Sequence, residues 1–423
     1  MELNAPQLPD PQAVTEAVNQ WIAADSQLSG LLESGLTLQQ ALSKWATQLL
    51  VSNRIVEASS GFLAAVTLAP QDPLAWSNYG IALDRANSLV KAAECLSYSL
   101  ALQPLQPETW LSLGFVRKKQ GDISGAETTY LRALEQNPNS PLVLQCLGLL
   151  KEEQRDYPAA IHYLSTSTRY GEPSADLLAN LGRLYYQTGR IAEANDFYAR
   201  AVNGAEANPL YRQMHRKMRF LRDIIKGESV GAALTAYQDA FVPADRPSEK
   251  DLVELFNTGL GVLGGFGYLD AATQLGRKQL ELWPDSPSVS YMLKAFVGGT
   301  SVDRSPPGYI VEHFDAFAEG FDAQLVGTLG YDIPEKLCAA VEAATPLGHR
   351  YEAVDAGCGT GLCGPLLRPF VSSLTGVDLS SKMLDQAAKK EAYDRLVCED
   401  LTPFLERSPG QFDLMVAADV MIY

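Results

Sequence analysis

Residues 354–361, Val-Asp-Ala-Gly-Cys-Gly-Thr-Gly, decide how the carboxyl-terminal part of this 423-residue chain folds. The apolar run over 352–355 predicts a buried strand, and residues 362–370 predict the start of a helix. Between them, alternate glycines let the backbone turn sharply and approach a ligand closely, beside the unpaired amides of a helix amino terminus. Strand, tight turn and helix open a ligand-binding α/β domain. Taken alone, the glycine pattern also fits a structural turn in another α/β protein.

The sequence after residue 361 adds further strands, each of which closes on an acid. Residues 374–378, 396–400 and 412–419 predict three short strands, and residues 380–387 predict a helix. Because open α/β sheets bind ligands beyond the carboxyl ends of their strands, these acids point to one site. Asp378 lies where a ribose would be bound. A carboxylate there accepts from both ribose hydroxyls and disfavours a 2′-phosphate.

With these four ordered motifs, residues 305–423 resemble the class I S-adenosylmethionine-dependent methyltransferases. The resemblance implies a Rossmann-like sheet with S-adenosylmethionine as cofactor, and it implies that Asp378 takes the ribose hydroxyls. By the same resemblance Asp400, in preference to Glu399, bonds the adenine amino group, and Asp419 lies near the sulfonium and the incoming substrate. The residues implied around the methionyl part of the cofactor are Asp355, Gly357, Gly359 and Gly361. Each single carboxylate has an alternative role as a helix cap or a solvated acid.

A 34-residue period organises the first half of the chain. Shifting the sequence by this period superposes three sets, namely Gly80, Gly114, Gly148 and Gly182; Ala58, Ala92, Ala126, Ala160 and Ala194; and Phe62, Leu96, Tyr130, Leu164 and Tyr198. Each period predicts one antiparallel helix pair, with small residues where the two helices approach most closely. The pattern resembles the tetratricopeptide repeat, with five units over residues 39–206. That resemblance implies a right-handed superhelix whose concave groove binds an extended peptide or a partner helix, that is, a protein partner.

The remaining segments complete a domain prediction of α plus α/β class. Residues 1–38 form a helical cap for the first repeat, because terminal repeats need a cover, and residues 207–304 form degenerate repeat-like helices and a linker. Paired prolines at 306 and 307 mark the boundary to the domain at 305–423.

Residues 309–331 are unusually aromatic and look like the helical lead-in of bacterial methyltransferases that carry tetratricopeptide repeats at their amino terminus. The resemblance implies that this lead-in lies over the cofactor pocket. Phe314, Phe317 and Phe321 are expected to pack in the core, which leaves Tyr309 as the predicted cofactor contact. Methyl transfer depends on alignment and on the exclusion of water, and a general base is needed only for some acceptors. His313 and Asp419 are the candidate bases by position alone.

The carboxyl terminus departs from the family pattern. A complete domain of this class has seven strands in the order 3-2-1-4-5-7-6, whereas the motifs account for strands one to four and only 62 residues follow Gly361. The sequence therefore predicts a truncated domain with weak or no catalysis and with strand four as an unpaired apolar edge.

Composition excludes several other classes of function. A formal charge of −16 makes nucleic acid an unlikely partner, since binding to phosphate backbones relies on lysine and arginine. Six cysteines without CxxC pairs and four scattered histidines predict no metal site. The amino terminus has no signal-peptide pattern and no apolar run of about 18 residues occurs, so we expect a cytoplasmic protein without membrane association.

Two functions remain. The first is a methyltransferase whose repeats recruit a protein or carrier-bound substrate. The second is a protein-protein interaction scaffold with a vestigial cofactor-binding half-domain.

Overall fold

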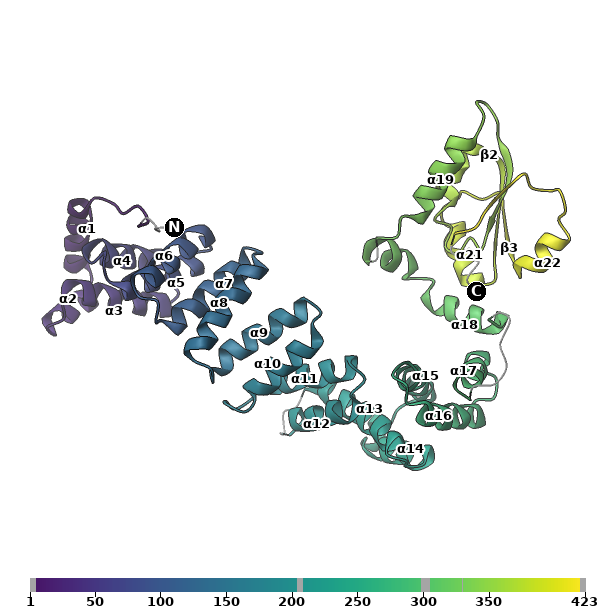
Figure 1. The fold of residues 1–423 in the computed structure, drawn as a ribbon, viewed down its shortest axis with the longest axis horizontal. Helices are drawn as coiled ribbons and strands as arrows, with labels where there is room; N and C mark the ends of the chain where they lie inside the picture. The colour runs from purple at the N-terminus through teal and green to yellow at the C-terminus, as the bar shows by residue number, and fades with distance from the viewer. Residues whose placement is uncertain (1–4, 204–207, 298–304, 329, 419–423) are drawn as a thin grey trace. The chain divides into compact units, whose positions relative to one another are not determined.

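A computed structural model describes residues 5–203, 208–297, 305–328 and 330–418, and the chain forms two compact units, 1–218 and 219–423 (Figure 1). The predicted fold class is confirmed, because a helical-repeat solenoid is followed by a small parallel sheet with helices. Along the chain, the boundary between the two units falls within α13 (Pro209–Ile225). The domain boundaries expected at 38/39, 206/207 and 304/305 stay predictions.

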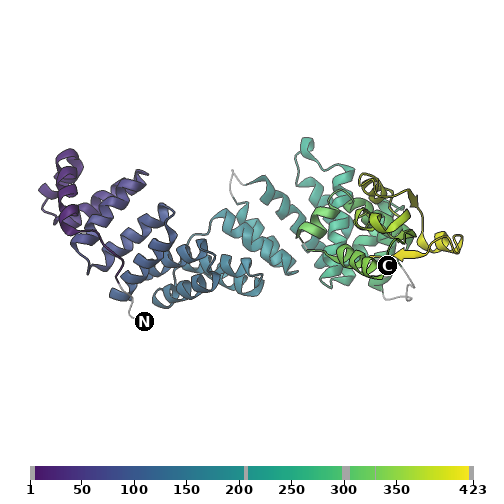
Figure 2. The same cartoon turned by 90° about the horizontal axis from the view of Figure 1, so that it is seen from above.

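The first unit contains helices and no strand among its described residues. From α3 to α12 each helix packs on the next as a pair, and Figures 1 and 2 show the helices of this unit stacked side by side in chain order. The helices are α1 (Pro11–Ala24), α2 (Ser26–Glu33), α3 (Leu38–Val51), α4 (Ile55–Leu68), α5 (Pro73–Arg85), α6 (Leu89–Leu102), α7 (Pro107–Lys119), α8 (Ile123–Gln136), α9 (Pro141–Glu153), α10 (Tyr157–Ser167), α11 (Ala175–Gln187) and α12 (Ile191–Ala201).

The first helix of several pairs begins at a proline, at Pro73, Pro107 and Pro141, one 34-residue period apart. Proline suits the first helical turn because its missing amide would have no partner inside the helix. The period of the sequence therefore sets where each pair starts.

Close contact between the two helices of a pair depends on glycine. A Cβ at Gly114 would lie 2.3 Å from the ring of Tyr130, which is itself buried. The same conflict recurs one period apart, with Leu96 facing Gly80, Leu164 facing Gly148 and Tyr198 facing Gly182 at 2.5–2.8 Å. The large side chain of the second helix thus occupies the space that glycine leaves on the first.

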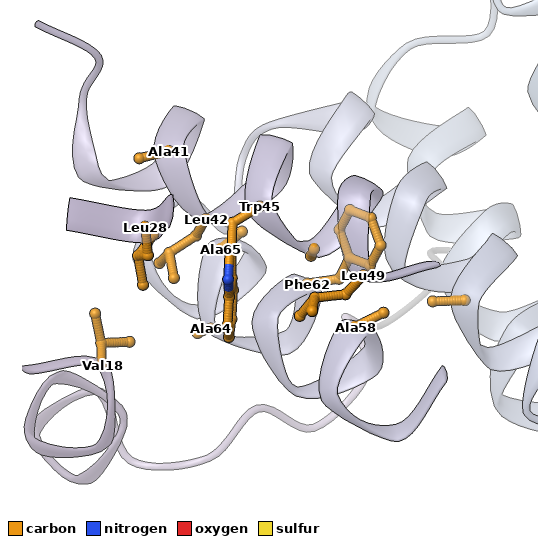
Figure 3. Close-up of a cluster of buried hydrophobic side chains, with 12 residues drawn as sticks. Val18, Leu28, Ala41, Leu42, Trp45, Leu49, Ala58, Phe62, Ala64 and Ala65 are labelled. Carbon is orange, nitrogen blue, oxygen red and sulfur yellow. The ribbon is translucent and has the colours of Figure 1, made fainter. Parts of the chain in front are cut away.

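A small helical cap covers the first pair. Figure 3 shows Val18 of α1 and Leu28 of α2 beside Leu42 and Trp45 of α3, and both cap side chains are fully buried. The Trp45 indole donates to Asp25 at the α1–α2 joint, 2.9 Å away. The cap therefore buries the apolar face that the first repeat would otherwise expose.

The second unit begins with helices and ends in an α/β sheet. Its helical elements are α14 (Val230–Asp239), η1 (Pro243–Asp245), α15 (Glu249–Gly265), α16 (Leu269–Leu282), α17 (Pro287–Val297), α18 (Pro307–Phe317), the π-helix η2 (Ala323–Thr328), α19 (Ile333–Ala344), α20 (Gly364–Leu367), η3 (Arg368–Phe370), α21 (Ser381–Ala388) and α22 (Leu401–Glu406). Its strands are β1 (Tyr351–Ala356), β2 (Val371–Asp378), β3 (Arg395–Cys398) and β4 (Leu414–Val416).

The four strands are parallel in the order β3-β2-β1-β4, so the two central strands are those that carry the strongest motifs. One cluster of buried side chains joins Ala353 and Leu374 to Cys338 of α19, and another joins Val354 and Val377 to Phe404 of α22. Both faces of the central strands are covered, as parallel sheets require.

The bounds of several predicted elements differ from those observed. The strand expected over 412–419 is observed at Leu414–Val416. The helix expected over 362–370 is a four-residue α20 followed by a 3-10 turn, because Pro365 suits only the first turn and Pro369 then lacks the amide that would continue the helix. The strand expected over 396–400 ends at Cys398, since Asp400 caps the amino terminus of α22. Among the described residues, no helix combines the length and the hydropathy needed to cross a bilayer.

We predict that Gly114→Ala destabilises the repeats. The added methyl must displace the Tyr130 ring, which costs about 1–3 kcal/mol, and the better helix propensity of alanine returns about 1 kcal/mol. Urea unfolding followed by tryptophan fluorescence measures the change, because four of the five tryptophans, Trp21, Trp45, Trp76 and Trp110, lie in the first unit. The midpoint should fall.

Gly261→Ala is the matched control. Gly261 lies inside α15 of the second unit, and no atom comes within 4 Å of its missing Cβ. The fluorescence midpoint of this variant should stay at the wild-type value. Equal midpoints for the two variants would contradict the packing role of Gly114.

Candidate functional site

A cavity of about 620 Å³ lies at the carboxyl ends of β1, β2 and β3. Its walls are the glycine-rich loop after β1, the last residues of β2, the start of α22, and side chains from the segment of α18 and η2. Its size is in the range of sites for small molecules and cofactors. The location is the one expected for the ligand of an open α/β sheet.

The loop after β1 is shaped by three glycines at positive φ, Gly357 (67°), Gly359 (54°) and Gly361 (81°). Its first two amides, from Gly357 and Cys358, both donate to the carbonyl oxygen of Val377 at 2.8 and 3.0 Å. No atom lies within 4 Å of the missing Cβ of Gly359, which is one of the residues that line the cavity. Gly359 therefore leaves its part of the wall bare, and a ligand can reach the backbone there.

Asp378 at the end of β2 joins the loop to the next helix. Its Oδ2 accepts from the amide of Gly359 and its Oδ1 accepts from the amide of Ser380, each at 2.9 Å. A carboxylate has about four acceptor positions, so roughly two remain for hydroxyl groups of a ligand. Burial raises the pKa of Asp378 and the backbone donors oppose that rise.

Asp355 at the end of β1 is the deepest acid of the cavity and is only 1% exposed. The hydroxyl of Tyr393 donates to its Oδ2 at 2.6 Å. Burial, opposed by the hydrogen bond from Tyr393 and reinforced by the nearby Asp378, raises the pKa of Asp355 to about 6. The protonation state of this carboxyl thus changes just below neutral pH.

Tyr393 also packs against the glycine-rich loop, and it was not predicted from the sequence as a site residue. A Cβ at Gly361 would meet its ring at 2.9 Å, one at Gly364 at 2.6 Å and one at Gly376 at 2.9 Å. The ring therefore occupies the space shared by three glycines. No local pattern marks Tyr393, because its partners lie 17 to 38 residues earlier in the chain.

Asp400 and Glu399 follow β3, and both line the cavity. Asp400 caps α22 by accepting from the amide of Thr402 at 3.0 Å. Both carboxylate oxygens of Glu399 are held by the guanidinium of Arg407. Both acids thus have structural bonds in addition to any ligand that they contact.

The segment of α18 and η2 contributes Ile310, Phe314, Phe321 and Leu325 to the cavity wall. Phe314, Phe317 and Phe321 were expected in the core, but Phe314 and Phe321 line the cavity and Phe317 is exposed. Tyr309 and His313, proposed as cofactor contact and base, are not among the residues that line it. Tyr309 packs on Tyr291 of α17 at 4.8 Å and on His313 at 6.0 Å.

The reason lies in helix geometry. Ile310 and Phe314 are four residues apart and share one face of α18, while Tyr309 and His313 share the neighbouring face. A one-residue step around a helix turns a side chain by about 100°, so the two pairs cannot face the same wall. Tyr309 and His313 are therefore placed against α17 and neighbouring aromatic rings.

Two further predictions concern the second candidate base and the absence of a metal site. Asp419, the other candidate base, lies outside the described residues. Within the described part of the chain, no group of three or more histidine, cysteine, aspartate or glutamate residues is arranged to hold a metal ion.

Comparison with known proteins agrees with the two parts of the fold. Residues 353–423 match the family described as "Methyltransferase domain", and residues 107–140, 129–162 and 147–210 match families described as "Tetratricopeptide repeat". A curated relative, the 18S rRNA (guanine-N(7))-methyltransferase of Bos taurus, is 34% identical over 64 residues. That match covers 15% of this chain, and the chain spans 23% of the relative's length.

Solved structures of repeat proteins are similar to the helical part. A thermophilic TPR protein of Thermus thermophilus is 20% identical with a TM-score of 0.33, over 43% of this chain and 98% of that one. A tetratricopeptide repeat protein of Parabacteroides merdae is 15% identical with a TM-score of 0.37, over 61% of this chain and 98% of that one. The repeat assignment rests on the family matches and the 34-residue period. The chain thus carries tetratricopeptide repeats followed by a carboxyl-terminal domain of the methyltransferase family.

Proposed function

We propose that the chain is an S-adenosylmethionine-dependent methyltransferase whose tetratricopeptide repeats recruit a protein or carrier-bound substrate, in the cytoplasm. The observation that carries the cofactor proposal is the arrangement of Asp378. Its two oxygens are fixed by the amides of Gly359 and Ser380, and acceptor positions remain at the cavity wall.

The residues present fit such a cofactor. Asp378 would accept from the ribose hydroxyls, and the bare backbone at Gly359 lets the methionyl part approach the loop. Asp355 and Gly357 also line that end of the cavity, whereas Gly361 does not line it and shapes the loop through its positive φ. Asp400 lines the cavity beyond β3, where it would bond the adenine amino group. When bound, the cofactor supplies an electrophilic methyl group on a sulfonium.

The charge of the cavity supports a cationic ligand. Four acids line it, Asp355, Asp378, Glu399 and Asp400, and none of its described lining residues is lysine, arginine or histidine. S-adenosylmethionine carries a sulfonium, whereas its product S-adenosylhomocysteine carries a neutral thioether. Carboxylates in a partly enclosed wall therefore favour the charged cofactor.

The chain's own contribution to transfer is alignment and exclusion of water. The apolar side chains of Ile310, Phe314 and Phe321 cover one side of the cavity and keep water from it. Asp419 and His313 stay candidate bases for acceptors that need one. His313 would have to turn toward the cavity from its present place beside Phe317.

Ion pairs between successive repeats support the recruitment proposal. Salt bridges link the first helices of successive pairs: Asp84 to Lys119, Lys118 to Glu153, and Glu152 to Arg183. A protein or peptide bound in the repeat groove would meet helices whose charges are already paired along the solenoid. Because exposed ion pairs add little stability, we assign these three pairs a role in orienting successive helix pairs relative to one another.

We predict that Asp378→Ala weakens S-adenosylhomocysteine binding by about 10- to 100-fold or more, because hydrogen bonds to a charged group are lost. Isothermal titration of the product into wild-type and variant chain measures the change. Asp385→Ala is the control, since Asp385 is an exposed acid on α21 that does not line the cavity. Absence of binding by the wild-type chain would contradict the cofactor proposal and favour the scaffold function.

We also predict that the preference for S-adenosylmethionine over S-adenosylhomocysteine grows about 3- to 10-fold between pH 5 and 7. The raised pKa of Asp355, about 6, leaves the carboxyl neutral at pH 5 and ionised at pH 7. The ionised form attracts the sulfonium and has no such effect on the thioether. Titrations with both compounds at several pH values give the ratio of the two dissociation constants.

Asp355→Asn is the matched control for this pH dependence. The amide keeps the size of the side chain and an acceptor for Tyr393, but it does not ionise. Its ratio of dissociation constants should stay flat. In Tyr393→Phe, loss of the hydrogen bond that lowers the pKa of Asp355 should move the transition to higher pH. A transition that persists unchanged in Asp355→Asn would assign it to another group.

A further inference from the structure

The apolar wall formed by α18 and η2 is weakly anchored by burial. No residue of α18 is buried, and Phe317 and Val326 are 45% and 47% exposed. Burial of apolar side chains is the main force that holds helices in place, and this segment buries few of them. A π-helix such as η2 is rare, and π-turns are frequent at functional sites. Other contacts must hold the segment against the cavity.

Asp322 makes the first of these contacts. Its Oδ1 accepts from the hydroxyl of Thr360 in the glycine-rich loop, and its Oδ2 accepts from Lys390 after α21 at 2.7 Å. Lys390 also donates to the carbonyl oxygen of Thr360 at 2.7 Å. The three groups close a ring of hydrogen bonds that joins the segment to the loop.

The parts of this ring differ in exposure. The side chain of Thr360 is buried, that of Lys390 is 23% exposed and that of Asp322 is 41% exposed. An isolated pair at such exposure is worth little because solvent screens it. Here the carboxylate also satisfies a buried hydroxyl, and leaving that hydroxyl without a partner carries a cost.

Asp315 on α18 makes a second contact, with the hydroxyl of Ser380. Ser380 is fully buried, and its oxygen also accepts from the amide of Met383 at the start of α21. The segment is therefore fastened by carboxylates to the residues that follow β1 and β2. Phe314 directly precedes Asp315, Phe321 directly precedes Asp322, and both rings line the cavity.

We propose that Asp322 is a positioning residue that holds the apolar segment of α18 and η2 over the bound cofactor by fastening Phe321 and Leu325 to the glycine-rich loop through Thr360 and Lys390. The proposal rests on the proposed function, because it takes the ligand of the cavity to be the methyl donor or its product. Asp322 touches neither. It acts by keeping the segment closed over the cavity, so its removal changes the rate at which the ligand dissociates.

The test measures dissociation of S-adenosylhomocysteine from the full chain by stopped-flow competition. Asp322→Ala should raise the dissociation rate about 3- to 10-fold, as loss of a charged hydrogen-bond partner at partial exposure allows. Asp322→Asn, whose amide oxygen still accepts from Thr360, should raise it less. Lys390→Met should resemble Asp322→Ala, and Lys390→Arg should restore a rate near that of the wild type.

Asp332→Ala and Lys336→Met are the matched controls, because these residues form an exposed ion pair at the start of α19 with the Nζ 2.8 Å from Oδ2. Both should keep the wild-type dissociation rate. Amide hydrogen exchange provides a second measurement: Asp322→Ala should lose protection over residues 310–325 and keep it in β1 and β2. A merely structural role would lower protection in the strands as well.

The outcomes separate the two proposals. If the wild-type chain does not bind S-adenosylhomocysteine, the cofactor proposal is wrong and this inference fails with it. If the wild-type chain binds and Asp322→Ala leaves the dissociation rate unchanged, the cofactor proposal stands and the positioning role is wrong. Faster dissociation with exchange confined to 310–325 supports the role. If Asp322→Ala only slows association and leaves the dissociation rate unchanged, the positioning role is wrong.

Discussion

In both compact units, large side chains fill space that a Cβ would need. The residues concerned are Leu96, Tyr130, Leu164 and Tyr198 in the repeats, facing Gly80, Gly114, Gly148 and Gly182, and Tyr393 in the sheet domain, facing Gly361, Gly364 and Gly376. In the repeats this sets how closely two helices pack. In the sheet domain it sets the path of the loop that lines the cavity. Since protein interiors are close-packed, an added methyl group at these positions has nowhere to go without moving a neighbour.

The loop path in turn decides the electrostatics of the site. With the loop pressed onto β2, the amides of Gly357 and Cys358 share the carbonyl oxygen of Val377, and the amide of Gly359 is left to bond Asp378. The same compactness buries Asp355 and Asp378, and burial raises the pKa of both carboxyls; Asp378 raises that of Asp355 further, and Asp315 raises that of Asp378. Two acids held close in a low-dielectric wall cost stability unless a cation compensates them. The arrangement is therefore one that a cationic ligand would relieve.

Much of the fold could be predicted from the sequence, because its pattern is either periodic along the chain or confined to neighbouring residues. The 34-residue register gives the helix pairs, and apolar runs that end in acids give the four strands, so the fold class was predicted correctly. The length of the helix after the glycines was not, because Pro365 and Pro369 overrule the apolar pattern there. Tyr309 and His313 were preferred to Phe314 as site residues, whereas the cavity is lined by Ile310 and Phe314, one step further around the helix, a difference that composition cannot resolve. Tyr393 and Asp322 gave no signal, since their bonds to Asp355 and Thr360 each span 38 residues.

The position of Asp322 shows why such contacts matter for a cavity that must both hold and release a ligand. A segment anchored by a large apolar face would stay shut, because each buried aliphatic side chain adds about 1.5–3 kcal/mol. A segment anchored by solvent-screened carboxylates is closed by a smaller free energy, and its open form is correspondingly more populated. Asp315 and Asp322 place that modest stabilisation at two separated points, each next to a phenylalanine that lines the cavity, Phe314 and Phe321. The apolar surface then excludes water while the polar contacts determine how long it stays in place.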